Sequence, residues 1–594
     1  MRSDSQANDR KGLTLLARAK RQSFLHGALI LSGAAVLVKL IGALFKIPLQ
    51  HPLLAGMTGY GYFATAYEVY LPVYTVAVAG LPVAVSRLVA EAVTLHRFAD
   101  VQVIYRMARR IFLVTGTLGL AVMLAAAFFY PAYVGMPGSF LSMLVMAPSV
   151  FFCCMAAVHR GLYEGLRNMV PTACSQVLEA LGKLLLGLGL AVAAMWWGQR
   201  CYAQGEPVFG AVAASAAHAR ELSLPYMAAG AMAGVTLGSF ASMLYLMLRY
   251  ARRGSELTAQ ELAASPPPIT GRRALRALLV MAFPVALAAL ATQLTNLIDV
   301  ASLQRCLKLV LERHGGEVEQ MYAAQLAADG TRDVLAWLVG SRSTAMTYVN
   351  LVPTITLTFG ISALPVITSA WAMQNRQQMK ATVESVLRIT LLVALPAGIG
   401  LSVLAEPLMF LVYGQKHVSE IVGPMLQVLG IATIFVCLTA PVNSIFQAVG
   451  RADIPAKIIV LGGVVKLILN VVLVTRPEWN VMGSVYSTAA CYAVMVIAGL
   501  LTLHRLLQLR LPVWKTVGKP LIAALLCGAA AWASNGLFAW AISPRLATVL
   551  AVGLAGIVYG ICLLVLKILT KDDVFMLPKG EKIAKILEKH DWIG

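Results

Sequence analysis

Residues 24–49 read FLHGALILSGAAVLVKLIGALFKIPL, an almost unbroken apolar stretch that contains only two charged residues, Lys39 and Lys46. A helix needs about 20 such residues to cross the hydrocarbon core of a bilayer. The stretch is longer than the apolar core of a signal peptide, and no small-residue cleavage site follows it. We therefore expect a first transmembrane helix that is retained in the mature protein, behind a basic cytoplasmic segment at residues 1–23.

Similar stretches recur along the rest of the chain, which has 594 residues, 59% of them hydrophobic and 13% charged. Soluble proteins carry about 25% charged residues, so this composition excludes a soluble enzyme, a disordered protein and a disulfide scaffold. The further candidate spans are 61–85, 110–134, 141–159, 171–197, 226–248, 278–301, 345–372, 386–404, 422–446, 455–474, 481–504, 519–540 and 547–568. We predict an all-α integral membrane protein with about fourteen transmembrane helices.

Basic residues are in excess: 48 lysines and arginines stand against 27 acidic residues, which gives a formal net charge of +21. They punctuate the apolar blocks instead of gathering on one surface with aromatic residues, so we expect no nucleic-acid binding. Most of them fall in alternate segments between spans, as the positive-inside rule requires of cytoplasmic segments. The pattern predicts a multi-pass protein of the cytoplasmic (plasma) membrane with both termini in the cytoplasm.

Two short motifs recur within the chain. Residues 81–86 read LPVAVS and residues 364–369 read LPVITS, whereas GLYEG at 161–165 returns more weakly as SIFQA at 444–448. Both pairs share one offset of 283 residues (364 minus 81, and 444 minus 161). Two matches with the same offset indicate an internal repeat.

Six predicted spans separate the copies, so both copies point the same way across the membrane. This arrangement predicts two six-helix lobes that are parallel repeats, as in some secondary transporters that work by alternating access. The N-lobe would be residues 24–249, the C-lobe residues 278–504, and two further helices would occupy 519–568. A cytoplasmic Pro-rich connector at 250–277 would join the lobes.

Three features lie outside the predicted spans. Residues 303–344 form a charged stretch that we expect to be an external loop, partly helical. The C-terminal segment 569–594 carries a lysine stripe opposite apolar residues, which suits a cytoplasmic amphipathic helix on an anionic membrane leaflet. Cys201 and Cys306 are the only cysteines in segments predicted to be external, so at most one disulfide is expected, and whether they pair stays open.

Ionisable side chains inside a membrane are costly and are functional candidates by default. Within the predicted spans basic groups outnumber acidic ones, which favours an anionic substrate such as a phosphate or pyrophosphate headgroup. We predict a pyrophosphate-binding set of Lys39, Arg87, Lys183 and Lys466. We predict a charge-balancing or gating set of Glu68, Glu179 and Asp299.

Some of these residues have structural alternatives. Glu179 and Lys183 are spaced i,i+4, so the two side chains could neutralise each other on one helix. Asp299 could pair with a cation of the external loop. Lys39 and Lys466 lack an acidic partner in their own helices, which favours a place on the lining of a cleft between the lobes.

Several kinds of chemistry leave no trace in the sequence. The chain contains no G-x-x-x-x-G-K-[ST] loop and no G-x-S-x-G or H-E-x-x-H signature. Its cysteines and histidines have no metal-site spacing. We therefore expect a transporter rather than an enzyme, without an ATPase motif, a metal or a cofactor. An ion gradient, the membrane potential or substrate flux would drive it, with H+ and Na+ both open as the coupling ion.

The motifs resemble those of a known family. GLPVAVSRLVAE at 80–91 resembles the segment that ends the second helix of the stage V sporulation protein B-like polysaccharide transporters. RGLYEGLRNMVPT at 160–172, followed by SQVLE at 175–179, is similar to the family's stretch between helices four and five. NLID at 296–299 and VKLILN at 465–470 match its seventh and eleventh helices.

This family belongs to the multidrug/oligosaccharidyl-lipid/polysaccharide exporter superfamily, alongside the lipid II flippases. The resemblance implies fourteen helices, two six-helix lobes and a flippase for undecaprenyl-pyrophosphate-linked cell-wall or polysaccharide precursors. It also implies a lipid-linked sugar as the substrate and cell-wall synthesis enzymes as candidate partners. Two alternatives stay open: a cation-coupled multidrug exporter of the same superfamily, and a membrane glycosyltransferase or ligase.

Overall fold

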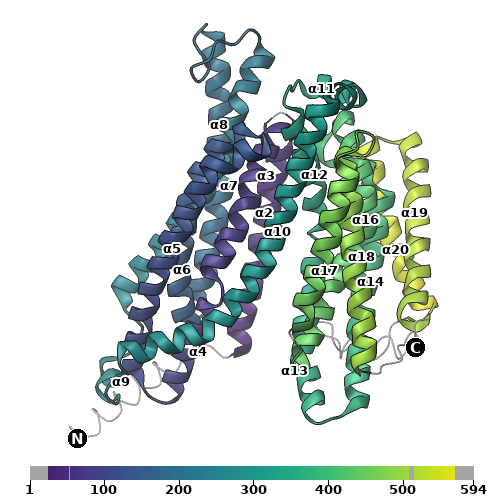
Figure 1. The fold of residues 1–594 in the computed structure, drawn as a ribbon. Helices are drawn as coiled ribbons and strands as arrows, with labels where there is room; N and C mark the ends of the chain where they lie inside the picture. Colours follow the sequence, from purple (N-terminus) through teal and green to yellow (C-terminus); the bar gives the residue numbers. More distant parts are fainter. Residues whose placement is uncertain (1–23, 53, 452, 508–513, 569–594) are drawn as a thin grey trace, which may run out of the picture. The chain divides into compact units, whose positions relative to one another are not determined.

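The computed structural model describes residues 24–568 except positions 53, 452 and 508–513 (Figure 1). Within these residues the regular structure is helical, apart from one isolated β-bridge between Val208 and Ala211. The all-α fold class predicted from the sequence is therefore confirmed. The predicted cytoplasmic segment 1–23 and the predicted amphipathic tail 569–594 lie outside the described residues.

The chain divides into two compact units, with the boundary between Leu297 and Ile298 inside one long helix, α10 (Gly271–Met321). The helices before α10, all in the first unit, are α2 (Phe24–Gln50), α3 (Gly56–Val78), α4 (Leu81–Thr94), α5 (Phe98–Val134), η1 (Pro137–Ser139), α6 (Phe140–Gly165), α7 (Val170–Ala203), α8 (Ala216–Arg253) and α9 (Ala259–Ala263). The helices after α10, all in the second unit, are α11 (Ala323–Asp329), α12 (Val334–Val349), α13 (Pro353–Ala372), α14 (Arg376–Val403), α15 (Ala405–Tyr413), α16 (Lys416–Ala448), α17 (Asp453–Leu469), η2 (Asn470–Val474), α18 (Asn480–Leu507), η3 (Trp514–Gly518), α19 (Lys519–Ala541) and α20 (Pro544–Val565).

Thirteen helices in the described part of the chain are long and apolar enough to cross a membrane. The one other predicted span, residues 345–372, corresponds to the end of α12 and to α13, which is not among the thirteen. The 20 residues of α13 would extend about 30 Å, the thickness of a bilayer core. The two helices expected beyond the repeat are present as α19 and α20.

The segment 303–344 differs from the partly helical external loop that we expected, because it is helical over most of its length. α10 continues beyond the predicted end of the seventh span and is kinked at His314 (φ −133°, ψ 29°). Leu303, Leu307 and Val310 are each at most 1% exposed, and their spacing places them on one helix face. Burial of this apolar stripe explains why the helix continues.

In the first unit the two repeated motifs contact each other. A Cβ atom added to Gly165 of α6 would lie 2.7 Å from the carbonyl oxygen of Ser86 in α4. A Cβ on Gly161 would lie 2.9 Å from the carbonyl oxygen of Pro82. Small residues permit such close helix approach in membranes. The first copies of the two motifs are therefore the two sides of one helix–helix interface.

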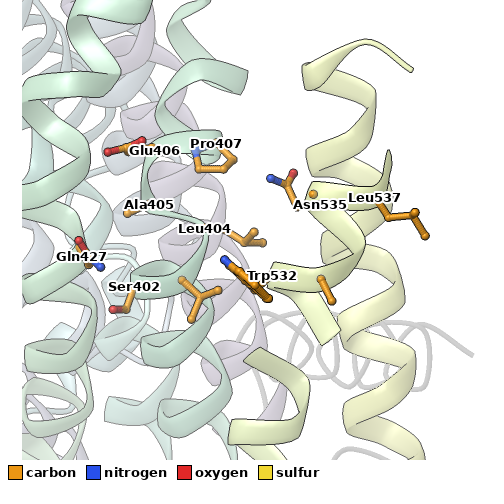
Figure 2. A pocket seen from close by; sticks show the side chains of 12 residues that line it. Ser402, Leu404, Ala405, Glu406, Pro407, Gln427, Trp532, Asn535 and Leu537 are labelled. Carbon is orange, nitrogen blue, oxygen red and sulfur yellow. The ribbon is translucent and has the colours of Figure 1, made fainter. Parts of the chain in front are cut away.

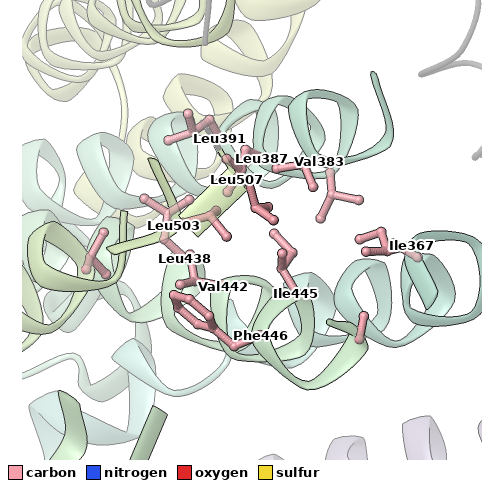
Figure 3. Close-up of a cluster of buried hydrophobic side chains, with 14 of the residues drawn as sticks. Ile367, Val383, Leu387, Leu391, Leu438, Val442, Ile445, Phe446, Leu503 and Leu507 are labelled. Carbon is pink, nitrogen blue, oxygen red and sulfur yellow. The ribbon is translucent and has the colours of Figure 1, made fainter. Parts of the chain in front are cut away.

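The second unit repeats this contact between α13 and α16. A Cβ on Gly360 of α13 would lie 2.8 Å from the Ser444 hydroxyl of α16. Ile367 and Ile445, both in the second motif copies, are each 1% exposed and belong to one buried apolar cluster (Figure 3). The tertiary structure thus explains the shared offset. Within each unit the copy of the first motif packs against the copy of the second motif, so the two motifs recur together.

We predict that Gly165→Ala destabilises the protein. The added methyl group would overlap Ser86 and Val89 of α4, and overpacking of this kind costs about 1–3 kcal/mol. Gly189→Ala in α7 is the matched control, because a Cβ there meets nothing within 4 Å and alanine favours a helix over glycine. Thermal unfolding of the purified variants in detergent measures both; equal melting temperatures for the two variants would contradict the prediction.

The Pro-rich stretch between α9 and α10 is attached to the start of α5. The Asp100 carboxylate accepts a hydrogen bond from the Ile269 backbone N–H at 2.8 Å and pairs with Arg97 at 2.5 Å. The Ala99 backbone N–H donates to the Ser265 hydroxyl at 2.9 Å. Because Asp100 is only 4% exposed, these bonds are shielded from water. They fix the connector to the first unit.

Candidate functional site

A row of aromatic rings organises the interior of the first unit. Tyr60, Phe63, Tyr67, Tyr70 and Tyr74 follow one another at intervals of three and four residues, so they lie on one face of α3. Neighbouring ring centroids are 5.6–6.0 Å apart. The row gives α3 a rigid polar-tipped face, against which charged side chains from neighbouring helices pack.

Lys183 of α7 lies against this face. Its Nζ atom is 4.9 Å from the ring centroid of Phe45 in α2 and 4.9 Å from that of Tyr67. Aromatic faces attract an ammonium group through their negative quadrupole. Within the described residues Lys183 makes no ion pair with a carboxylate. The amine is therefore held by two rings and remains available to an anion.

Glu179 does not pair with Lys183, although their i,i+4 spacing allowed it. Its Oε2 atom lies 2.8 Å from a terminal guanidinium nitrogen of Arg160 in α6. Arg160 also donates to the hydroxyls of Ser175 and Ser242, each at 2.9 Å. The planar guanidinium of Arg160 donates to three acceptors at once. The ammonium of Lys183 lacks this fixed, planar set of donors. Tertiary packing thus decides the partner of Glu179.

Lys46 and Glu68 complete the cluster. The Lys46 ammonium lies at the Tyr60 hydroxyl and near Tyr67 and Glu68, and Lys183 lies near Lys46. With Arg160 and Glu179, the cluster contains three basic and two acidic side chains from α2, α3, α6 and α7. We name these five residues, Lys46, Glu68, Arg160, Glu179 and Lys183, the N-unit cluster.

The structure brings some predicted site residues together and leaves others apart. Lys183, Glu179 and Glu68 belong to the N-unit cluster. Lys39 is exposed on α2, two helical turns before Lys46, and Arg87 is exposed on α4. Neither of these two contributes to the contacts of the cluster described above.

The sequence reasoning missed Lys46 as a site residue, because its place near a span end favoured a side chain that reaches the membrane surface. It also missed Arg160, which directly follows the predicted fourth span. Two signals were present in the sequence: Lys46 shares a helix face with Lys39, and Arg160 precedes the repeated GLYEG motif.

In the second unit Lys466, which has no acidic partner in its own predicted span, is paired with a carboxylate of another helix. Its Nζ atom lies 2.6 Å from Oδ2 of Asp299 in α10, and the Asn470 amide donates to Oδ1 at 3.0 Å. The Lys466 and Asp299 side chains are 12% and 15% exposed. A charge shielded to this degree requires a partner. The carboxylate therefore takes the cation of α17 rather than one beyond the end of the span.

The two charged sites consequently differ in net charge. The N-unit cluster has an excess of one basic group, whereas Lys466 and Asp299 balance each other. Among the described residues no three His, Cys, Asp or Glu side chains gather as a metal site would require. All nine cysteines lie within the described residues and are free thiols, Cys201 and Cys306 included. The chemistry that the N-unit cluster offers is non-covalent binding of an anion.

Two family models match the chain. The family described as polysaccharide biosynthesis protein matches residues 24–318, and the family described as lipid II flippase MurJ matches residues 342–550. Together the two matched ranges include every site residue named above, both in the N-unit cluster and in the Lys466–Asp299 pair. The two models together cover most of the chain and support its membership in the multidrug/oligosaccharidyl-lipid/polysaccharide exporter superfamily. The sequence-based recognition of this superfamily is confirmed.

Curated relatives match between 81% and 97% of the chain. Stage V sporulation protein B of Bacillus subtilis is 24% identical over 94% of this chain and 98% of its own. The lipid II flippase MurJ of the same organism is 22% identical over 81% of this chain and 82% of its own. An uncharacterised membrane protein of B. subtilis, YabM, is 24% identical over 97% of this chain and 98% of its own.

Solved structures from the superfamily share the fold. A lipid II flippase MurJ in an inward closed conformation has a TM-score of 0.57 at 13% identity, covering 91% of this chain and 98% of that one. An inward-facing multidrug resistance MATE family transporter has a TM-score of 0.56 at 14% identity, covering 80% and 95%. Because the two are almost equally similar in fold, the fold alone does not choose between their transport activities.

Proposed function

We propose that this chain is a flippase that moves an undecaprenyl-pyrophosphate-linked cell-wall or polysaccharide precursor across the cytoplasmic membrane by alternating access. The lipid II flippase family model and the lipid II flippase relative of B. subtilis support a lipid-linked sugar as the substrate class, and the polysaccharide biosynthesis model agrees with a sugar-containing substrate. The chain is a transporter and not an enzyme. The structural observation that carries the proposal is the amine of Lys183, placed among membrane helices without a carboxylate partner in the described residues.

The N-unit cluster would bind the diphosphate. A diphosphate beside Lys183 would favour the ammonium form of that amine, and Lys46, which lies near Lys183, would share the anion. The Arg160–Glu179 pair would keep α6 and α7 in register, so that the amine of Lys183 stays between its two rings. Glu68 would balance the charge of Lys46 when no substrate is bound.

The remaining predicted site residues receive other roles. Arg87 and Lys39 are exposed basic residues of the first unit, and they would attract the diphosphate before it reaches the cluster. Asp299 would neutralise Lys466 and join α10 to α17. Both termini would be cytoplasmic, and the Lys-rich tail 569–594 would lie on the anionic leaflet. Cell-wall synthesis enzymes would be partners that supply or use the precursor.

Reconstituted protein tests the proposed function directly. Proteoliposomes containing a fluorescent polyprenyl-pyrophosphoryl sugar should transfer it between leaflets, as measured by quenching with an impermeant reductant. Protein-free liposomes are the control. A cation-coupled drug exporter, which the MATE fold similarity supports only weakly, would instead move cationic dyes under an ion gradient. Dye transport without any transfer of the lipid-linked sugar would overturn the proposal.

A further inference from the structure

The second unit contains a pocket of about 730 Å³ between the end of α14, α15, α16 and α19 (Figure 2). Ser402, Glu406 and Gln427 lie on one side of it, and Trp532 and Asn535 of α19 lie on the other (Figure 2). None of these residues belongs to the N-unit cluster or to the Lys466–Asp299 pair. The pocket is large enough for a small ligand or a lipid headgroup.

The pocket exists because α14 stops while α19 continues. α14 ends at Val403, and Leu404 (φ −98°, ψ 19°) separates it from α15. Just before this break the two helices pack tightly, since a Cβ on Gly528 would lie 2.6 Å from Ile399. Leu404 and Ala531 close the floor in a small apolar cluster. Beyond that floor α15 packs against α16 and α20, and the space beside α19 is left open.

The polar groups in the pocket have unused hydrogen-bonding capacity. Within the described residues, the side chains of Ser402, Glu406 and Gln427 make no hydrogen bond or ion pair. Trp532 is 72% exposed, and its indole N–H likewise has no acceptor in that part of the chain. Asn535 accepts a hydrogen bond from the Thr548 hydroxyl at 3.3 Å, which leaves its amide N–H groups free to donate.

The charge of the lining selects among ligands. Glu406 is the one charged side chain among the residues that line the pocket, so an anion alone would be repelled. A neutral sugar would satisfy hydrogen bonds but would leave the carboxylate without a counter-charge. A primary ammonium satisfies the carboxylate through charge-assisted hydrogen bonds. The donors of Gln427, Trp532 and Asn535 then suit an anionic group that is covalently attached to that ammonium.

We propose that this pocket binds the headgroup of phosphatidylethanolamine. Its ammonium would contact Glu406, and its phosphodiester would accept hydrogen bonds from Trp532 and Asn535. The acyl chains would follow the apolar surface of α19, where Leu537 is 67% and Leu525 is 54% exposed. With the N-terminus in the cytoplasm, this end of α19 faces the external side, so the lipid would come from the external leaflet.

Competition between lipids tests the proposal. The full-length protein is purified in detergent with equal amounts of phosphatidylethanolamine, phosphatidylcholine and phosphatidylglycerol, and native mass spectrometry counts the lipids retained. We expect preferential retention of phosphatidylethanolamine. Phosphatidylcholine carries the same charges but no ammonium N–H donor, so it separates hydrogen bonding to Glu406 from simple charge attraction. Equal retention of the three lipids would overturn the proposal.

Variants localise the binding. Glu406→Gln should reduce retention of phosphatidylethanolamine about tenfold, since a charge-assisted hydrogen bond is lost. Glu478→Gln is the matched control, because Glu478 is an exposed carboxylate that does not line the pocket. Trp532→Ala should lower retention as well, and the fold should be kept because the Trp532 side chain is exposed. Undiminished retention by Glu406→Gln, or a matching loss in Glu478→Gln, would contradict the assignment.

This experiment is independent of the flippase proposal, because lipid retention is counted without any transport step. A variant that loses phosphatidylethanolamine but still transfers the lipid-linked sugar would support the pocket as a separate lipid site. Retention of an added glycolipid in preference to phosphatidylethanolamine would instead assign the pocket to sugars and refute the ammonium contact.

Discussion

Lys183→Ala should reduce transfer of the lipid-linked sugar at least about tenfold, because a charge-assisted hydrogen bond to a phosphate contributes about 1.5–3 kcal/mol. The loss follows from the position of the amine, 4.9 Å from the centroids of Phe45 and Tyr67 and outside any ion pair in the described residues. Its removal leaves no buried carboxylate unpaired, since Glu179 is paired with Arg160. Folding should therefore be little changed while transport fails.

The proteoliposome assay with the fluorescent polyprenyl-pyrophosphoryl sugar measures this effect at matched protein content. Lys457→Ala is the control, because Lys457 is 77% exposed at its side chain and pairs only with the surface residue Asp453. Size-exclusion profiles and melting temperatures should be the same for both variants. Full transfer by Lys183→Ala would remove this lysine from the mechanism and would leave the proposed diphosphate site without its main contact.

Lys466→Met should destabilise the protein by about 3 kcal/mol, because removing one member of a buried ion pair leaves the other charge without compensation. Asp299 would keep only the Asn470 amide as a donor at 3.0 Å, in a site where its side chain is 15% exposed. The double variant Asp299→Asn with Lys466→Met removes both charges. It should recover most of the lost stability, since no charge remains buried.

Melting temperatures of the wild type, the two single variants and the double variant form a complete cycle, and the interaction energy is their non-additive part. Transport by the double variant gives an independent reading. If Lys466 serves only to neutralise Asp299, the double variant should transport the sugar. If the double variant is stable and yet inactive, Lys466 contacts the substrate and the structural role assigned here is wrong.

These two experiments separate two kinds of membrane-buried lysine that look alike in the sequence. Lys183 and Lys466 occur at similar distances after the prolines that follow the second repeated motif. In the structure one amine is held by aromatic rings and the other by a carboxylate. The internal repeat therefore predicts where a lysine lies in each unit but not what it contacts.

The N-unit cluster was partly predictable. Lys183, Glu179 and Glu68 stand out because ionisable residues are rare within apolar spans. Arg160 and Lys46 stand at the ends of their spans, where a basic residue more often reaches the membrane surface. Whether such a residue turns inward depends on acceptors from other helices, such as Ser175 and Ser242 for Arg160.

By itself the sequence determined that the chain is an all-helical membrane protein, where most of its spans lie and that it contains a repeat. It did so because bilayer thickness dictates the length and apolarity of each span, and both are local properties. Only the tertiary structure decided that Glu179 pairs with Arg160, that Asp299 pairs with Lys466 and that α10 continues through the expected loop. The partner of a shielded charge is the best-placed group on any adjacent helix, and adjacency between helices is not a local property of the chain.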